Sequence, residues 1–382
     1  MSVYSNVSTF FLRFDLASPH LTFPFQLTLI SSAAMTYARS AIARIAGYVP
    51  GEQPQGKPLI KLNTNENPYP PSAKVIAAAR EFDFARLRLY PEPSARIVRE
   101  AAADLYGFTP EHVVCGNGSD DLLTIALRTF VDQGGKLAFT TPSYSLYPVL
   151  ADLQGATCQP VELDSDFNLP ANAAELAGDA PLFILARPNA PTGTNTPKDG
   201  VRKLCRQFPG VVWIDEAYVD FSDDNCLDLA REFPNVVVSR TLSKSYSLAG
   251  LRLGLAIANP ELILEMNKVR DSYNVDMLTQ VIGAAALRDS EAMRANASRI
   301  VATRAWLAAE LTRLGAEVLP SAANFLFAKP LRPAADVFAD LRARGFLVRY
   351  FNLPRISEYI RITIGRQTDM EAFVKAFAEC GR

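Results

Sequence analysis

Short apolar runs rich in β-branched residues alternate with segments of helical periodicity between about residues 113 and 258. The runs at 182–186, 211–214 and 236–238 contain no charged side chain, as is typical of strands buried on both faces. Strands that alternate with helices in this way form an open, mostly parallel, doubly wound sheet, and ligands bind at the carboxyl ends of its strands. The sequence therefore predicts an α/β fold whose functional motifs lie at one edge of a central sheet.

The chain continues beyond this alternating region for more than a hundred residues. After Pro260 the pattern becomes mainly helical, and a further strand is predicted at 324–327. A chain of 382 residues is long enough for a large domain and a smaller one. We predict an N-terminal arm at 35–70, a large domain at 71–270 and a small α+β domain at 271–382 that includes part of the arm.

The first 34 residues differ in character from the rest of the chain. They are largely hydrophobic, but Pro19 and Pro24 would interrupt a membrane helix. We predict that residues 1–34 are a non-native or disordered extension and that Met35 is the natural start. An apolar fraction of 49% with 21% charged residues argues for a soluble protein, and a net charge of -1 gives no reason to expect nucleic acid.

The supply of cysteine and histidine limits the possible chemistry. The five cysteines are scattered without a CxxC pair, which indicates neither a zinc site nor a disulfide framework and fits a reducing cytoplasm. Only two histidines are present, which argues against histidine-based metal sites and against a Ser-His-Asp triad. Lysine, tyrosine or a carboxylate must therefore carry protons in any catalytic reaction.

The stretch 239–254, SRTLSKSYSLAGLRLG, lies between two apolar runs and contains one lysine, Lys244. A lysine on such a connection is either solvated or held against the core, where its amine can act as a nucleophile. Thr241 and Ser243 precede the lysine and Arg252 follows it on a glycine-containing turn, so these groups can converge on one phosphate. An amine beside a phosphate site is what pyridoxal phosphate requires.

With TLSK followed by LAGLRLG, this stretch resembles the cofactor-binding segment of fold-type I pyridoxal phosphate enzymes, and more narrowly of the histidinol-phosphate aminotransferases. Further motifs in the same order extend the resemblance from about residue 39 to the C-terminus: LNTNENPYP, GNGSDD, RPNAPTGT and WIDEAY. The resemblance implies a class II aminotransferase of histidine biosynthesis in which Lys244 carries pyridoxal 5'-phosphate. Such an enzyme transfers the amino group of histidinol phosphate to 2-oxoglutarate and forms glutamate.

The motif GNGSDD opens a predicted helix, and a helix N-terminus presents free backbone N–H groups to an anion. By itself the motif also fits an ordinary capped helix, and it lacks the third glycine of a dinucleotide fingerprint. The resemblance makes Gly118, Ser119 and Asp120 the other half of the phosphate cup. It also assigns Tyr90 to the cofactor phosphate of the partner subunit, which implies a homodimer with shared active sites.

Four side chains are assigned to the cofactor ring. Asp215 follows a hydrophobic strand, where a carboxylate either caps the next turn or needs a cation. The resemblance supplies that cation as the protonated ring nitrogen. It places Tyr144 against the ring face, where simple core packing is the alternative, and it places Asn189 and Tyr218 at the phenolic oxygen. The chain departs from the family's PNNPTGT motif at Ala190, which leaves Asn189 in place.

The resemblance makes Tyr48, Arg349 and Arg361 the substrate-binding residues. Taken alone, Tyr48 also fits an ordinary loop tyrosine, and either arginine fits a solvated surface residue. One arginine suits a carboxylate, whereas two suit a phosphate dianion, and the resemblance assigns both arginines to the substrate phosphate. Two rival activities use the same fold: an aromatic amino-acid aminotransferase and a threonine-phosphate decarboxylase. A non-catalytic cofactor-sensing regulator would need a DNA-binding module, and the N-terminal sequence supplies no basic helical domain.

Overall fold

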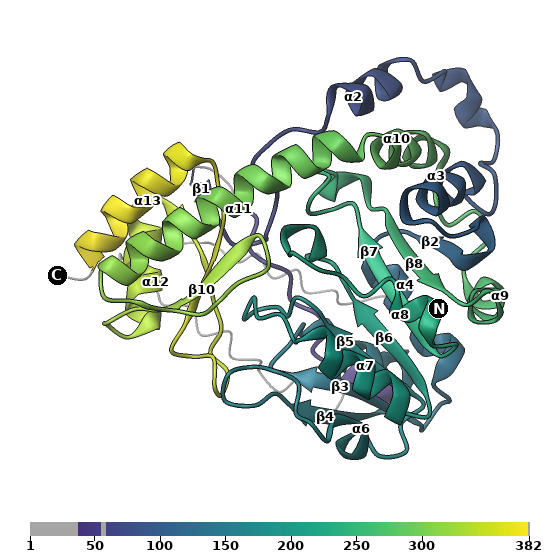
Figure 1. The fold of residues 1–382 in the computed structure, drawn as a ribbon, viewed down its shortest axis with the longest axis horizontal. Coiled ribbons are helices and arrows are strands. Elements are labelled where there is room, and N and C mark those ends of the chain that lie inside the picture. Colours follow the sequence, from purple (N-terminus) through teal and green to yellow (C-terminus); the bar gives the residue numbers. More distant parts are fainter. Residues whose placement is uncertain (1–36, 55–58, 381–382) are drawn as a thin grey trace, which may run out of the picture.

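The computed structural model describes residues 37–54 and 59–380, so the predicted extension at 1–34 and the predicted start at Met35 lie outside them. In the described residues the chain forms a large sheet and a smaller sheet, both covered by helices, with a long helix running between them (Figure 1).

Seven strands form the large sheet. In chain order they are β2 (Val113–Gly116), β3 (Lys136–Thr141), β4 (Thr157–Glu162), β5 (Leu182–Ala186), β6 (Val211–Asp215), β7 (Val236–Thr241) and β8 (Gly254–Ala258). Their order across the sheet is β2-β8-β7-β6-β5-β3-β4, and only β8 runs antiparallel to its neighbours. The prediction of a mostly parallel α/β sheet is therefore confirmed.

Helices cover both faces of this sheet (Figure 1). The helical elements around the sheet are α2 (Ala73–Arg80), η1 (Phe84–Arg88), α3 (Arg96–Tyr106), η2 (Pro110–His112), α4 (Ser119–Phe130), α5 (Leu146–Gln154), α6 (Ala173–Leu176), α7 (Lys198–Gln207), η3 (Val219–Phe221), α8 (Leu229–Glu232), η4 (Ala249–Leu251), α9 (Pro260–Val269) and α10 (Met277–Arg288). Successive strand residues enter separate apolar cores, with Phe183 and Ile214 in one and Ile184 and Trp213 in the other. This two-sided burial explains why the strands read as continuous apolar runs.

The smaller sheet is antiparallel and has the strand order β12-β13-β10-β9. Its strands are β9 (Glu317–Val318), β10 (Phe325–Lys329), β12 (Arg349–Tyr350) and β13 (Ile360–Thr363). Helices α11 (Ser290–Arg313), α12 (Ala334–Ala343) and α13 (Gln367–Cys380) accompany it. Figure 1 shows α11 running from the end of α10, beside the large sheet, to the small sheet.

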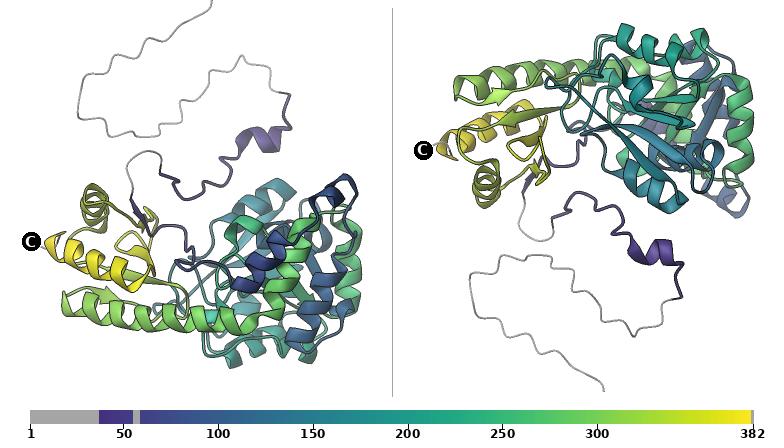
Figure 2. Two further views of the ribbon diagram at one scale, coloured as in Figure 1. Left: turned by 90° about the horizontal axis from the view of Figure 1, so that it is seen from above. Right: turned by 90° about the horizontal axis from the view of Figure 1, so that it is seen from below.

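The N-terminal arm belongs in part to this smaller unit. Strand β1 (Ile60–Lys61) pairs in parallel with β11 (Phe346–Leu347), whereas α1 (Ser40–Arg44) lies earlier on the arm. Figure 2 shows the segment that carries α1 on one side of the molecule. The predicted domain boundaries stay predictions.

Among the described residues, none of the helices combines the length and the apolar character that crossing a bilayer needs.

Gly254, the first residue of β8, lies against the backbone that opens α4. A methyl group on Gly254 would lie 2.7 Å from the carbonyl carbon of Gly118 and 2.7 Å from the nitrogen of Ser119. We expect Gly254→Ala to lower the free energy of unfolding by about 1–3 kcal/mol, because the crowded backbone has to shift. Urea denaturation of the cofactor-free protein measures the change.

Gly250→Ala is the matched control, because Gly250 is exposed and a methyl group there would meet nothing within 4 Å. Its effect on the free energy of unfolding is expected to stay within about 0.5 kcal/mol. Equal stability of the two variants would contradict the crowding at Gly254.

Candidate active site

A cavity of about 570 Å³ lies where the carboxyl ends of the large-sheet strands face the small sheet. Its volume is within the range of small-molecule sites. Most of the predicted site residues line this cavity: Tyr48, Ser119, Asp120, Tyr144, Asp215, Tyr218, Thr241, Ser243, Lys244, Arg252, Arg349 and Arg361. Gly118, Asn189 and Tyr90 are the predicted site residues outside its wall.

Lys244 lies on the connection from β7 to β8, as predicted, and is half-buried. Its Nζ donates a hydrogen bond to the carbonyl oxygen of Thr64 at 3.2 Å. The same Nζ lies 5.7 Å from the centre of the Tyr218 ring. No carboxylate within the described residues forms an ion pair with it, so its amine is held by weak partners at the cavity wall.

Asp215 is the last residue of β6 and is 6% exposed. Its carboxylate accepts hydrogen bonds from Tyr147 Oη at 2.9 Å and from the Ala217 N–H at 3.2 Å, with Ser239 Oγ at 3.4 Å. Burial raises the pKa of Asp215 to about 6, although the Tyr147 hydrogen bond opposes this shift. The cavity therefore contains a carboxylate that forms no ion pair with the described residues, and a cation there would offset the cost of its burial.

The predicted phosphate cup forms at the start of α4. The helix begins after Gly118 (φ 88°) without a side-chain cap, so its first N–H groups are available to an anion. The Arg252 guanidinium closes the opposite side, with Nη1 donating to Ser243 Oγ at 3.3 Å and Nη2 lying 3.5 Å from Asp120 Oδ2. A methyl group on Gly118 would lie 2.6 Å from Arg252 Nη2, so only glycine leaves room for this approach.

Aromatic rings line the wall beside this cup. The Tyr144 ring makes edge contacts with Tyr48, at a centroid distance of 5.7 Å, and with Tyr147, at 5.6 Å. The Tyr144 hydroxyl donates to Asp120 Oδ1 at 3.3 Å. These contacts fix the orientation of a ring that stands at the cavity wall, where it can pack against a flat ligand.

Asn189 is buried behind the cavity wall. Its Nδ2 donates to the Pro142 carbonyl at 3.0 Å and to Thr192 Oγ1 at 2.8 Å, while its Oδ1 accepts from Ser143 Oγ at 2.8 Å. The predicted contact with a cofactor oxygen stays a prediction, and it requires one of these internal hydrogen bonds to be exchanged.

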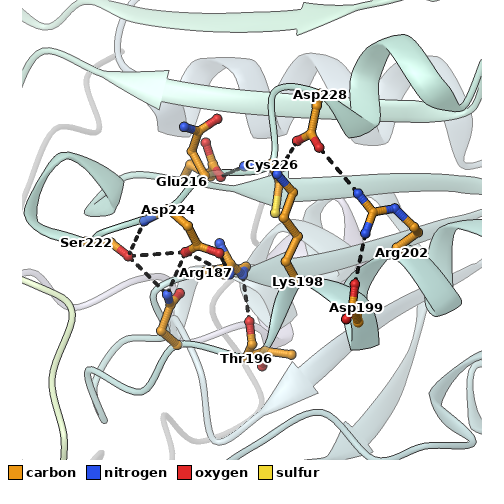
Figure 3. A network of polar contacts seen from close by, with 12 residues as sticks. Arg187, Thr196, Lys198, Asp199, Arg202, Glu216, Ser222, Asp224, Cys226 and Asp228 are labelled. Atoms are coloured by element: carbon orange, nitrogen blue, oxygen red, sulfur yellow. Dashed lines mark hydrogen bonds and ion pairs between the residues drawn. The ribbon is translucent and has the colours of Figure 1, made fainter.

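A polar network holds the loop that carries Asn189 (Figure 3). Arg187, at 1% exposure, donates from Nε to the Thr196 carbonyl at 2.7 Å and pairs with Asp224 at 2.7 Å. Beside it, Glu216 accepts a hydrogen bond of 2.6 Å from the Cys226 N–H and pairs with Arg240 at 2.8 Å. Because Glu216 follows Asp215 directly, this network also fixes the end of β6.

Arg349 and Arg361 lie directly opposite each other on the neighbouring antiparallel strands β12 and β13. Like charges in such a pair repel, and neither arginine forms an ion pair with a carboxylate inside the described ranges. Arg361 donates from Nη2 to the Asn63 carbonyl at 2.8 Å. Its Nε is buried and has no hydrogen-bond partner among the described residues. Burial, with the charge of Arg349, lowers the pKa of Arg361. The pair therefore forms a cationic corner suited to an anion.

The arm residues Asn63, Thr64 and Asn65 contact three groups of the site in succession. The carbonyl of Asn63 accepts from Arg361, and that of Thr64 accepts from Lys244. The side chain of Asn65 donates to Tyr218 Oη at 2.9 Å. Sequence reasoning interpreted this motif, LNTNENPYP, only as an entry segment and missed these contacts, although three polar residues before a proline-broken turn were a visible signal.

Tyr90 lies outside the cavity and is 79% exposed. Its ring stacks on Tyr273 with centroids 4.7 Å apart. The predicted role of Tyr90 at the cofactor of a partner subunit stays a prediction.

A family model described as aminotransferase class I and II matches residues 57–377. The chain therefore belongs to this family of aminotransferases, which use pyridoxal phosphate, and the predicted cofactor is confirmed.

Similar proteins narrow the assignment within this family of aminotransferases. The histidinol-phosphate aminotransferase of Synechocystis sp. is 48% identical over 345 residues, which cover 90% of this chain and 98% of that protein. The histidinol-phosphate aminotransferase of Geotalea uraniireducens is 46% identical, with 90% and 99% covered. The chain thus belongs to the histidinol-phosphate aminotransferases.

A solved structure confirms the fold. The histidinol-phosphate aminotransferase of Sinorhizobium meliloti, crystallised with pyridoxal-5'-phosphate, superposes with a TM-score of 0.84 at 23% identity and covers 92% of this chain and 99% of its own. The predicted fold type I architecture is therefore confirmed.

Replacing Asp215 with asparagine removes the titrating group from the cavity. A carboxylate whose folded-state pKa is raised destabilises the fold wherever it is ionised, so the cost is absent below its ordinary pKa of 3.8 and complete above about 6. As the pH rises through this window, we expect cofactor-free wild type to lose on the order of 2–3 kcal/mol of stability relative to Asp215→Asn. Urea denaturation across the pH range measures the difference.

Asp166→Asn, on an exposed turn, is the control for this comparison and should follow the wild type. Parallel stability curves for wild type and Asp215→Asn would show that burial of this carboxylate carries no cost.

Proposed function

We propose that this chain transfers the amino group of L-histidinol phosphate to 2-oxoglutarate, with pyridoxal 5'-phosphate as cofactor, in the biosynthesis of histidine. The observation that carries the substrate assignment is the pair Arg349 and Arg361, which lie opposite each other and line the same cavity as Lys244. Two guanidinium groups without a carboxylate partner among the described residues match a phosphate dianion better than a single carboxylate.

The residues of the cavity fit the cofactor. When bound, pyridoxal phosphate supplies an aldehyde that joins covalently to an amine and a ring that takes up electrons from the substrate. Lys244 offers a half-buried amine, and the uncapped start of α4 together with Arg252 offers an anion site. Asp215 offers a carboxylate whose pKa is raised by burial, a cost that a cation of the ligand would offset.

Each group of the site then has a defined task. The amine of Lys244 would hold the cofactor and would take the proton from the substrate carbon that bears the amino group. The carboxylate of Asp215 would keep a proton on the ring nitrogen, the ring of Tyr144 would pack against the cofactor ring, and the hydroxyl of Tyr218 would face its phenolic oxygen. Asn189, behind the cavity wall, would join Tyr218 at the phenolic oxygen if one of the two hydrogen bonds that its Nδ2 donates were exchanged.

The phosphate of the cofactor is assigned to the first turn of α4 and to the hydroxyls of its surroundings. Ser119 and Ser243 supply hydroxyl groups, and Thr241, the last residue of β7, lines the same cavity. The carboxylate of Asp120 faces Arg252 and Tyr144, so it orients these side chains rather than meeting the anion itself.

Tyr48 closes the substrate side of the cavity, next to the two arginines. The exposed position of Tyr90 supports a homodimer in which Tyr90 of each protomer reaches the cofactor phosphate of the other. The absence of paired cysteines, all five of which are free, supports a cytoplasmic location.

Two rival activities predict different products from the same protein. A threonine-phosphate decarboxylase would release carbon dioxide and need no 2-oxoglutarate, whereas an aromatic aminotransferase would act faster on phenylalanine than on histidinol phosphate. Glutamate formation from histidinol phosphate and 2-oxoglutarate, with carbon dioxide monitored alongside, tests the proposal. Carbon dioxide release, or faster turnover of phenylalanine, would reject it.

Lys244→Ala removes the amine that holds the cofactor. We expect the visible absorbance of the bound cofactor and amino transfer both to be lost, because no other described lysine lines the cavity. Absorbance spectra and glutamate formation measure the two effects. Lys268→Ala, which removes an exposed lysine of α9, should change neither, and normal amino transfer by Lys244→Ala would reject the assignment.

Arg361→Ala removes one of the two guanidinium groups from the substrate corner. We expect KM for histidinol phosphate to rise by about 10–100-fold, the loss of one charge-assisted hydrogen-bonding partner, while the Kd for pyridoxal phosphate changes little. Steady-state kinetics and cofactor titration separate the two quantities. Arg313→Ala, on the exposed end of α11, is the control, and an unchanged KM in Arg361→Ala would remove this arginine from the site.

A further inference from the structure

Asn65 is buried and makes hydrogen bonds to a residue that follows β6 of the large sheet and to a residue of the small sheet. It is 1% exposed and has a φ of 57°, a left-handed conformation that asparagine tolerates better than most residues. Its side chain bonds Tyr218 of the large unit and Thr363 of the small sheet. The Nδ2 of Asn324 also donates a hydrogen bond to the backbone carbonyl of Asn65, at 2.9 Å.

The hydrogen bonds that join Asn65 to Thr363 and Tyr218 favour one orientation of the Asn65 side-chain amide. Thr363 Oγ1 accepts a hydrogen bond from the backbone N–H of Asn65 at 3.0 Å and donates its single proton to Asn65 Oδ1, also at 3.0 Å. With the amide reversed, this buried proton would have no acceptor among the described residues. With Oδ1 fixed as the acceptor, the amide nitrogen must face Tyr218. It therefore donates to Tyr218 Oη, at 2.9 Å.

The consequence lies at the Tyr218 hydroxyl. Because Asn65 donates to its oxygen, the proton of Tyr218 is not used by Asn65 and remains for another acceptor. No acceptor in the described part of the chain takes this proton, and Tyr218 lines the cavity. The hydroxyl is therefore set to donate into the cavity.

We infer that Asn65 is a positioning residue, held by Thr363, which fixes Tyr218 as a hydrogen-bond donor toward the cofactor. The inference rests on the proposed function, which assigns Tyr218 to the phenolic oxygen of pyridoxal phosphate. Thr363 and Arg361 are both on β13, so the strand that binds the substrate phosphate also fixes the polarity of the hydroxyl at the cofactor.

Asn65→Asp reverses this polarity with almost no change of shape. Aspartate also tolerates the left-handed backbone, and its carboxylate can only accept, so one oxygen takes the Thr363 proton and the other takes the Tyr218 proton. A hydrogen-bond donor to an ionised oxygen favours the ionised form. Loss of the Tyr218 donor should therefore raise the pH midpoint of the visible absorbance of the bound cofactor by about one pH unit, the size of one hydrogen bond.

The measurement is a pH titration of this absorbance without substrate, in wild type and Asn65→Asp, each with and without Tyr218→Phe. We expect the shift caused by Asn65→Asp to be large with Tyr218 and much smaller with phenylalanine, because the effect acts through the hydroxyl. An equal shift in both backgrounds would mean that the carboxylate acts by its charge alone and would overturn the inference. So would an unchanged midpoint in Asn65→Asp.

Two further comparisons keep the test decisive. If Asn65→Asp does not fold, Thr363→Val removes the group that fixes the amide; it should raise the midpoint, and Thr363→Ser should restore it. Failure of either result overturns the inference. Asn235→Asp makes the same exchange at a site away from the cavity, where the asparagine side chain donates to the carbonyls of Phe208 and Gly210. Its pH midpoint should match that of wild type.

The wild type separates this inference from the proposed function. Wild-type protein that shows no visible absorbance with pyridoxal phosphate overturns both. Wild-type protein that binds the cofactor, alongside an Asn65→Asp variant that titrates identically, overturns only the role of Asn65.

Discussion

The burial of the Asp215 carboxylate is the constraint on which the rest of the site depends. An ionised group at the end of a fully apolar strand has to be stabilised by hydrogen bonds and by a cation. The protein supplies the hydrogen bonds from Tyr147 and from Ser239, which Trp213 in turn holds with its indole N–H at 3.0 Å. The described residues form no ion pair with this carboxylate, so a cationic ligand there would offset the cost of the burial that raises the pKa of Asp215.

The remaining groups surround this carboxylate because of how the strands are ordered. Strands β6 and β7 are parallel neighbours, so Asp215 and the loop that carries Lys244 leave the sheet at the same edge. The start of α4 reaches the same edge because β2 also runs in this direction. The small sheet then adds the two arginines from the opposite side, and the arm between the sheets connects Arg361, Lys244 and Tyr218 through consecutive residues.

The sequence predicted those parts of the fold and site that depend on local pattern. Apolar runs located β5, β6 and β7, and motif order drew attention to Lys244 and Asp215. Strand β4 was missed because it is an edge strand, largely exposed and interrupted by Pro160, so it lacks the apolar run of its neighbours.

The contacts of Asn65 could not be predicted for a different reason. Its partners lie 153 and 298 residues away in the sequence, so only the tertiary fold brings them together. Tyr147 is similar, because its hydroxyl meets a carboxylate 68 residues further along the chain. Pattern identifies which residues can carry chemistry, whereas long-range packing decides how each of them is held.

The length of helix α11 affects how the small sheet is placed. Its 24 residues form a rod about 36 Å long that starts beside the large sheet and ends at the small one. A tilt of about 5° at its first turn displaces its far end by about 3 Å, roughly the length of one hydrogen bond. A rotation about its first turn would therefore be magnified at the small sheet, which carries Arg349 and Arg361.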